Sequence, residues 1–365
     1  MTGALIIILC MYIIMLVLFL SAWLSIRDLS PSQTTYHYTI IVPFRNEAPN
    51  LPSLITSLRG LAFPQSRYKV ILVNDHSEDD YMPLITELPT NFEVLHLPEV
   101  LAGKKAAIAH GVTHSETDII ITTDADCQHH ADWLNAFDAV FAQPGIQLVF
   151  GGVLFRTGGG LFAAMQRHEF ASLIGVGAAC WRLSKPVMCN GANLAFRKSV
   201  FHEVGGYGGN EQVASGDDEF LLEKIVHRYP DGIRYVSSAD AVVQTRAVES
   251  LGDFVAQRKR WAGKWRAGGW FKSVLAVFVA AVAVSTLIAG VHLIVTPDKW
   301  LASPLIVKII MEAVFIAVVM AKLGGRFSFF TFLLLQLIYP VYAMLFAIMA
   351  NMGGVRWKGR EIVHK

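Results

Sequence analysis

The segment from Asp118 to Cys127, DIIITTDADC, decides the fold of this chain. Its three isoleucines are β-branched and apolar, and Thr122 and Thr123 follow them. Such a run is typical of a strand that is buried on both faces of a sheet. The strand ends at Asp124-Ala125-Asp126. Open α/β sheets form their ligand crevices at the carboxyl ends of their strands, so the two carboxylates stand where a ligand is expected.

Asp124 and Asp126 would repel each other unless a cation joined them. Oxygen ligands of this kind suit Mg2+ or Mn2+, ions that commonly also hold the phosphates of a substrate. The alternative is a structural turn, in which Asp126 or a neighbour caps a helix near Ala131 to Ala142. Taken alone the segment favours the helix cap, whereas the rest of the chain favours the metal site.

Strand-like and helix-like runs alternate through residues 35–249. We expect strands at residues 39–42, 69–73 and 92–97 in addition to the central one, and helices at 50–60 and from residue 103. This alternation predicts an α/β fold with a mostly parallel, doubly wound sheet. Polar residues that follow successive strands would then gather along one edge of the sheet: Arg45, Glu47, Asp75, Asp124 and Asp126.

Two turns between the expected elements carry polar residues. Asn74-Asp75-His76-Ser77 is a turn that can also cap the next helix. Gly103-Lys104-Lys105 opens a helix at the end where the dipole disfavours cations. A lysine there suggests an anionic ligand such as a phosphate, and two solvated lysines are an equally good interpretation. The chain has no GxxxxGK[ST] and no GxGxxG, which disfavours a P-loop ATPase and a dinucleotide dehydrogenase.

Three later segments also contain candidate site residues. Cys189 to Phe196, which includes Asn190, suits either a close approach of the backbone to a ligand or a plain tight turn. Asp217, Asp218 and Glu219 begin a helix, where acids interact favourably with the dipole. The functional interpretation of these acids is a general base placed opposite the two aspartates. The segment QRKRW at 257–261 is either part of the site or a positive-inside signal with an interfacial tryptophan belt at 261, 265 and 270.

Composition predicts a membrane protein. The chain is 53% hydrophobic and 16% charged, whereas soluble domains carry about 25% charged residues. The mean hydropathy is +0.44. The formal net charge of +2 is uninformative, and we expect no nucleic-acid partner. Four cysteines without a CxxC pair indicate neither a zinc site nor a disulfide scaffold.

Four apolar stretches are candidates for membrane helices. Residues 4–23 can cross a bilayer, and the absence of a basic residue before them favours an uncleaved anchor over a signal peptide. The others lie at about 274–295, 304–321 and 327–350. The expected domains are an anchor at 1–24, a catalytic domain at 35–249, an amphipathic interfacial segment at 250–272, membrane helices at 273–350 and a basic tail at 351–365.

Taken together, these segments resemble the membrane-embedded branch of the family 2 glycosyltransferases, which have the GT-A fold. That branch includes hyaluronan, chitin, cellulose and poly-N-acetylglucosamine synthases and smaller enzymes that glycosylate lipids. IIVPFRNE is similar to the first-strand motif of the family, VNDHS to its VDDGS element and GKKAAI to its lysine motif. DAD is similar to its DxD, GDDEFL to its base motif and QRKRW to its QxxRW. Asn74 departs from the family, which often has an aspartate there.

The resemblance implies a role for each site residue. The nucleoside is surrounded by Pro43, Arg45, Glu47 and Asp75, with Asp75 facing a uracil-type edge. Asp124 and Asp126 hold Mg2+ or Mn2+, and Lys104 lies near the diphosphate. Asp218 is the catalytic base, and the remaining residues contact the substrate: Asn190, Asp217, Gln257, Arg260 and Trp261.

The function implied is an inverting transfer of a sugar from a nucleotide-sugar, expected to be a UDP-sugar, to a lipid or a growing glycan at the membrane. A processive synthase that extrudes its polymer is an alternative, as is an inactive nucleotide-sugar-binding membrane protein. A nucleotidyltransferase would also use paired carboxylates and Mg2+, but it would not require QRKRW beside membrane helices.

Localisation is expected at the plasma (inner) membrane, in contact with lipids, with several crossings and a cytoplasmic catalytic domain. Arg27 and the basic run at 258–272 agree with that orientation. The stretch from Pro304 to Ala321 is the weakest span, because it is short and carries Lys308 and Glu312, which share a helix face and could neutralise each other. We predict that it does not cross and that residues 357–365 lie in the cytoplasm near the catalytic domain.

Overall fold

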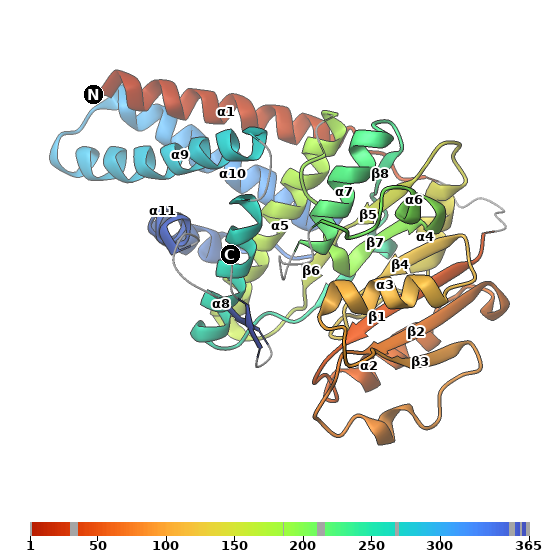
Figure 1. The fold of residues 1–365 in the computed structure, drawn as a ribbon. Helices are drawn as coiled ribbons and strands as arrows, with labels where there is room; N and C mark the ends of the chain where they lie inside the picture. Colours follow the sequence, from red (N-terminus) through yellow and green to blue (C-terminus); the bar gives the residue numbers. More distant parts are fainter. Residues whose placement is uncertain are drawn as a thin grey trace.

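The computed structural model describes residues 2–29, 36–184, 186–209, 216–266, 270–349, 355–357 and 360–362. Its centre is a seven-stranded sheet with the order β3-β2-β1-β4-β7-β5-β8 (Figure 1). All neighbours pair in parallel except β7, which is antiparallel to β4 and to β5. The expected α/β fold with a mostly parallel sheet is therefore confirmed. The strands are β1 (Tyr38–Phe44), β2 (Tyr68–Asn74), β3 (Phe92–His96), β4 (Ile119–Thr122), β5 (Leu148–Gly151), β7 (Leu194–Arg197) and β8 (Ile233–Val236).

Two hydrophobic cores lie on the two faces of this sheet, because successive side chains of a strand point to opposite faces. Ile41 and Ile120 belong to the core that contains residues of α3 (Lys104–His114), α5 (Gly160–Arg182) and α7 (Asp217–Arg228). Ile40 and Ile121 belong to the core that includes α2 (Leu51–Arg59) and α4 (Trp133–Phe141). Every residue of β4 is buried, as its uninterrupted apolar sequence predicts.

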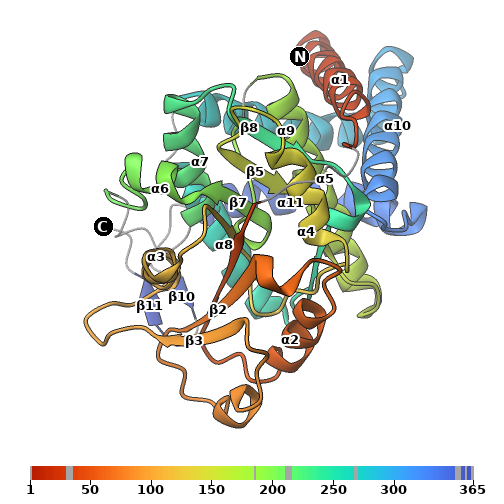
Figure 2. The same ribbon diagram turned by 90° about the vertical axis from the view of Figure 1, so that its right-hand side faces the viewer.

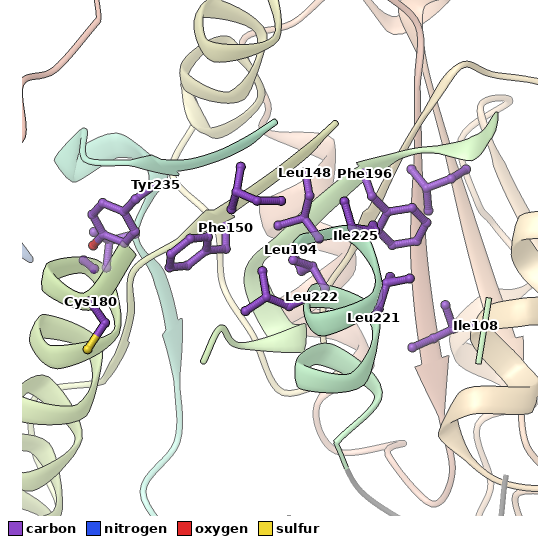
Figure 3. Close-up of a cluster of buried hydrophobic side chains, with 14 of the residues drawn as sticks. Ile108, Leu148, Phe150, Cys180, Leu194, Phe196, Leu221, Leu222, Ile225 and Tyr235 are labelled. Atoms are coloured by element: carbon purple, nitrogen blue, oxygen red, sulfur yellow. The ribbon is translucent and has the colours of Figure 1, made fainter. Parts of the chain in front are cut away.

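Helix α7 is held on the sheet by one apolar face. Leu221, Leu222 and Ile225 pack over side chains of β5 and β7, such as Leu148 and Leu194 (Figure 3). This packing fixes the first turn of α7, which contains Asp217 and Asp218, at the edge of the sheet. A small sheet pairs β6 (Val153–Phe155) in parallel with β9 (Val243–Thr245), and the short helix α6 (Lys198–Glu203) follows β7.

Two alternative interpretations of the turns, as helix caps, do not hold for Asn74 and Asp126. Asn74 caps no helix: its side chain accepts a hydrogen bond from the Ser77 backbone, and only a 3-10 turn at Met82–Ile85 separates β2 from β3. Asp126 does not cap α4, because the residue at the N-cap is Asp132, which makes no capping side-chain bond. The carboxylate of Asp126 is therefore left for another role.

Four helices are long and apolar enough to cross a membrane. They are α1 (Thr2–Leu24), α9 (Trp270–Val295), α10 (Lys299–Lys322) and α11 (Phe329–Met349). Figure 1 shows α1, α9 and α10 extending together away from the sheet, whereas α11 is seen nearly end-on. Helix α8 (Leu251–Arg266), which contains 257–261, contacts α9 and α11. The side chains of residues 265 and 270 lie outside the described part of the chain.

Helix α10 differs from the expected short span. It has 24 residues and packs along α1. Lys308 and Glu312 form the predicted ion pair, with 2.8 Å between Nζ and Oε2. Glu312 also accepts hydrogen bonds from Tyr12 of α1 and Gln336 of α11. A charged pair that is hydrogen-bonded by residues of neighbouring helices can lie inside a membrane. The two charges therefore do not make α10 the weakest span.

Candidate active site

One cavity of about 470 Å³ opens at the carboxyl ends of the parallel strands, a volume typical of sites for small molecules. Its walls come from the ends of β1, β5 and β8, from the segments that follow β2 and β4, and from α3, α5, α7 and α8. It gathers every site residue named from the sequence: Pro43, Arg45, Glu47, Asp75, Lys104, Asp124, Asp126, Asn190, Asp217, Asp218, Gln257, Arg260 and Trp261.

The two aspartates after β4 have different surroundings. Asp126 accepts a hydrogen bond from Thr245 Oγ1 at 2.8 Å. Burial, and then the negative charge of Asp124, raise the pKa of Asp126. Asp124 is more exposed, and its Oδ1 lies 2.6 Å from Lys104 Nζ. A raised pKa marks a carboxylate whose negative charge lacks full compensation from the protein.

Lys104 occupies the first turn of α3, as the sequence predicts. Gly103 precedes it with a φ of 94°, a conformation that favours glycine. The ammonium group lies between Asp124 and Asp217, at 2.6 and 3.7 Å. Burial disfavours its charge, but the two carboxylates outweigh burial and raise the pKa of Lys104. The interpretation as a solvated lysine is therefore wrong for this residue.

Asp75 and Arg45 line the cavity beside the start of α3. The carboxylate of Asp75 is buried and accepts a hydrogen bond from the backbone of Gly103 at 3.0 Å. Arg45 donates to the backbone oxygens of Asp75 and His76, at 3.0 and 2.6 Å. These bonds join the loops after β1 and β2 to the start of α3, so the three segments form one rigid wall.

Asp218 is oriented by backbone donors. Its Oδ2 accepts from Gly191 at 3.0 Å, and its Oδ1 accepts from Glu219 at 2.8 Å. A carboxylate has about four acceptor positions, and these two backbone bonds orient the group. Gly191 is required here, because a Cβ would lie 2.9 Å from Asp217 Oδ2. Asn190 caps the short turn at Gly191–Asn193 through its side chain, which confirms the tight turn that the sequence allowed.

Helix α8 forms one wall of the cavity, and the buried Arg258 fixes its position. Arg258 Nη2 lies 2.6 Å from Glu169 Oε2 of α5. Tyr342 of α11 donates to Glu169 Oε1 at 2.6 Å. The guanidinium also lies over the Phe254 and Trp261 rings, 4.4 and 4.3 Å from their centroids. Arg258 thus joins α8, α5 and α11, and Gln257, Arg260 and Trp261 line the cavity from the same helix.

Sequence reasoning missed an apolar wall. Phe170, Leu173, Ile174 and Gly177 of α5 line the cavity at the spacing of one helix face. Trp261 stacks on Phe170 with 5.4 Å between ring centroids. The helical spacing was visible in the sequence, but it did not indicate which face of α5 would remain uncovered. Thr245 and Arg246, which follow one another at the end of β9, were also missed.

The donor set fits a divalent cation. Seven carboxylates but only four basic side chains line the cavity. Asp124 and Asp126 supply hard oxygen ligands, and Mg2+ is commonly held by one or two carboxylates plus substrate phosphates. Elsewhere in the described chain, His130, Asp132 and Asp240 bring three ligand atoms within 4.8 Å. That cluster is largely exposed and lies outside the cavity.

Comparisons with known proteins agree with this geometry. Residues 39–205 match the model of the family Glycosyl transferase family 2. Glycosyltransferase AglE of Haloferax volcanii is 28% identical over 182 residues, which are 49% of this chain and 58% of that protein. An undecaprenyl-phosphate 4-deoxy-4-formamido-L-arabinose transferase of Klebsiella pneumoniae is 33% identical over 96 residues, 25% of this chain and 29% of that protein. The chain thus spans about a third to just over half of these relatives.

A solved structure shows the same fold. The mannosyltransferase PcManGT of Pyrobaculum calidifontis, solved in complex with GDP-Man and Mn2+, aligns with a TM-score of 0.54 at 18% identity. The alignment covers 96% of this chain and 96% of that one. It therefore extends over the apolar helices as well as the sheet.

Glu169→Gln should destabilise the protein, because it leaves the buried Arg258 guanidinium without its counter-charge. A lost hydrogen bond to a buried charged group costs about 1.5–3 kcal/mol. Thermal unfolding of the full chain in detergent measures the effect. The matched control is Glu203→Gln, which removes the same charge from the exposed pair with Arg228, where the contribution is small. Equal midpoints for the two variants would contradict the role given to Arg258.

Proposed function

We propose that this protein is a membrane-embedded family 2 glycosyltransferase that transfers a sugar from a UDP-sugar to an acceptor held at the membrane. The observation that carries the proposal is the cavity at the carboxyl ends of the parallel strands. It joins paired aspartates, a lysine, a carboxylate oriented as a base and an aromatic-basic helix that touches α11. A binding protein without turnover would not require this base.

The donor is proposed to lie along the wall from Arg45 to Asp124. Pro43, Arg45, Glu47 and Asp75 would surround the nucleoside, and Asp75 would read the base as a fixed acceptor. Lys104 would contact the diphosphate from its place between Asp124 and Asp217, as a compact positive charge suited to phosphate oxygens.

Asp124 and Asp126 would hold Mg2+ or Mn2+, which when bound supplies Lewis-acid stabilisation of the leaving diphosphate. Lys104 and Arg260 add positive charge where negative charge develops on that group. Asp218 removes the proton from the attacking hydroxyl as its oxygen bonds to the anomeric carbon. The bond from that carbon to the diphosphate breaks, and the nucleoside diphosphate leaves. A single displacement of this kind inverts the anomeric centre.

The acceptor is proposed to be a lipid. Its apolar part would pack on the α5 wall, which continues from the α8 site residues toward the membrane helices. Arg258 and Tyr342 connect that wall to α11 directly. A polymer synthase would need a path through the membrane for a polar chain. The polar network of Lys308, Glu312, Tyr12 and Gln336 bonds to itself and presents no such path.

Asp126→Ala should abolish metal-dependent binding of nucleotide, because it removes one of the two carboxylates that would hold the cation. Calorimetric titrations with UDP, GDP and CDP, each with and without Mn2+, measure this. UDP should bind best to the unaltered protein. Asp240→Ala is the matched control, since it removes an aspartate of the exposed cluster outside the cavity. Nucleotide binding that survives Asp126→Ala and still needs metal would contradict the metal site.

Asp218→Asn should fold and bind nucleotide normally but lose sugar transfer by about two to four orders of magnitude, the usual contribution of a general base. The amide keeps an oxygen for the Gly191 and Glu219 donors but cannot take a proton. Transfer is followed by mass measurement of the lipid product after a screen of UDP-sugars. The control is Asp138→Asn, an equally conservative change on α4. Near-normal turnover in Asp218→Asn would overturn the assignment.

The membrane topology is proposed to have three crossings, α1, α9 and α10, with the catalytic domain in the cytoplasm. Lys322, at the end of α10, donates to the backbone oxygen of Ile26 and lies 3.5 Å from Asp28, so α10 and α1 end on the same side. Helix α11 contacts the catalytic helix α5 near both of its ends. The Ser328 backbone donates to His168, and Tyr342 donates to Glu169. We therefore assign α11, rather than α10, as the helix that does not cross.

Under this topology the tail returns to the cytoplasmic face, where its basic residues satisfy the positive-inside rule. The hairpin of β10 (Val355–Trp357) and β11 (Arg360–Ile362) lies with β10 against α8, which agrees with a tail beside the catalytic domain (Figure 2).

A cysteine at the tail should be inaccessible from outside the cell. Lys365→Cys, in a background where the four native cysteines are replaced, is treated in intact cells with an impermeant thiol reagent. Labelling should appear only after the membrane is permeabilised. The matched control is Lys299→Cys, at the start of α10 next to the turn from α9, which should be labelled in intact cells. Labelling of both positions in intact cells would make α11 a crossing helix.

A further inference from the structure

A hydrogen-bonded turn before β7 holds the proposed base. The Gly191 backbone nitrogen donates to Asp218 Oδ2 at 3.0 Å. In the same turn the Asn193 backbone nitrogen donates to the Asn190 carbonyl oxygen at 2.9 Å, and the Asn190 side chain accepts from Ala192 at 2.9 Å. The Asn190 carbonyl and the Gly191 N–H belong to one peptide group, so the donor that contacts the base is held on both sides.

A hydroxyl group of β4 anchors this turn to the sheet. Thr122 is buried, and its Oγ1 donates to the Gly191 carbonyl oxygen at 2.7 Å. The Leu194 carbonyl oxygen lies farther away, at 3.4 Å from the same Oγ1. Residues two apart in a strand share a face, so Thr122 points to the face of Ile120, whose core includes residues of α7. The hydroxyl is therefore directed toward the side of the sheet where α7 carries Asp218.

This bond connects the metal-binding strand to the base. Thr122 is the last residue of β4 and lies two positions before Asp124. Gly191 contacts both Thr122 and Asp218, so two successive hydrogen bonds join β4 to the base. The strand itself does not require a hydroxyl here, because valine or isoleucine fits a buried strand equally well. The hydroxyl of Thr122 is thus explained by its bond to the turn.

We propose that Thr122 is a positioning residue, which fixes the base Asp218 relative to the carboxylates of Asp124 and Asp126. The inference rests on the proposed function and adds a residue to its mechanism. Thr122 does not line the cavity, so it acts through Gly191 and touches no substrate. Proton removal requires the base to stay within hydrogen-bond reach of the attacking hydroxyl. A displacement of about 1 Å in such a geometry can reduce the rate about a hundredfold.

Thr122→Val keeps the shape of the side chain but removes its hydroxyl. Purified full-length protein in detergent is assayed for sugar transfer with the donor found in the UDP-sugar screen and solubilised membrane lipid as the acceptor source. The kcat should fall about tenfold to a hundredfold, because the base is less well placed. The KM for the UDP-sugar and the calorimetric affinity for UDP with Mn2+ should not change, since Gly103, Asp75 and Arg45 hold the donor wall independently. Thr122→Ser retains the hydroxyl and should restore most of the kcat.

The matched control is Thr39→Val on β1. Thr39 is also fully buried, and its Oγ1 lies 2.8 Å from the hydroxyl oxygens of both Ser115 and Thr117. This variant should lower the thermal midpoint about as much as Thr122→Val does, because each change removes a buried hydroxyl that is hydrogen-bonded. It should leave kcat unchanged, because its bonds do not involve the turn before β7.

A double variant separates positioning from a general loss of structure. In Asp218→Asn no base is left to position, so adding Thr122→Val should cause no further loss of the residual transfer. Losses that multiply in the double variant would overturn the proposal. So would an unchanged kcat in Thr122→Val or an equal loss in Thr39→Val. A raised KM with an unchanged kcat would also overturn it, by assigning Thr122 to the donor wall.

Hydrogen exchange distinguishes a failure of this inference from a failure of the proposed function. If the unaltered protein transfers no sugar from any UDP-sugar, the proposed function fails. Deuterium uptake by residues 189–196 still tests the anchor. It should be about fivefold faster in Thr122→Val but not in Thr39→Val, as expected for the loss of one hydrogen bond. Unchanged uptake in Thr122→Val would overturn the positioning role.

Discussion

The repulsion between Asp124 and Asp126 is the constraint on which the rest of the site depends. Both carboxylates are fixed by the end of β4, a strand buried on both faces that cannot shift to separate them. Lys104 compensates Asp124, but the pKa of the half-buried Asp126 remains raised. A cation held between the two carboxylates would relieve this repulsion.

The hydrogen bonds around Asp75, Arg45 and Asp218 hold this part of the cavity wall in place. Gly103, Asp75 and Arg45 form a closed set of hydrogen bonds among three loops. Asp218 is held by two backbone donors, and its helix α7 is anchored by leucines on the sheet (Figure 3). Groups fixed in this way contribute electrostatic stabilisation without reorganising during a reaction.

The membrane side of the cavity is built differently, from packing between helices. Arg258 connects α8 to α5 and α11 through Glu169 and Tyr342, so the position of α11 determines where Gln257, Arg260 and Trp261 lie. Removing one partner of such a buried pair is costly, because the remaining charge is uncompensated. The helix α11 is thereby joined to a wall of the cavity through the contacts of Arg258 and Tyr342 with Glu169.

The sequence by itself determined the α/β class, the positions of the parallel strands and the polar residues at their ends. These features follow from local patterns: a buried strand must be continuously apolar, and a sheet edge must carry the polar residues that follow it. The sequence also indicated that Lys308 could pair with Glu312, since residues four apart share a helix face. Only the tertiary structure decided which segments far apart in the chain meet. The antiparallel β7, the uncovered face of α5, the contact of Arg258 with Tyr342 and the hydrogen bond from Thr122 to Gly191 all depend on pairings between distant residues. No local pattern encodes them, because the same apolar face or strand end could pack against several partners, and the packing of the whole chain selects one.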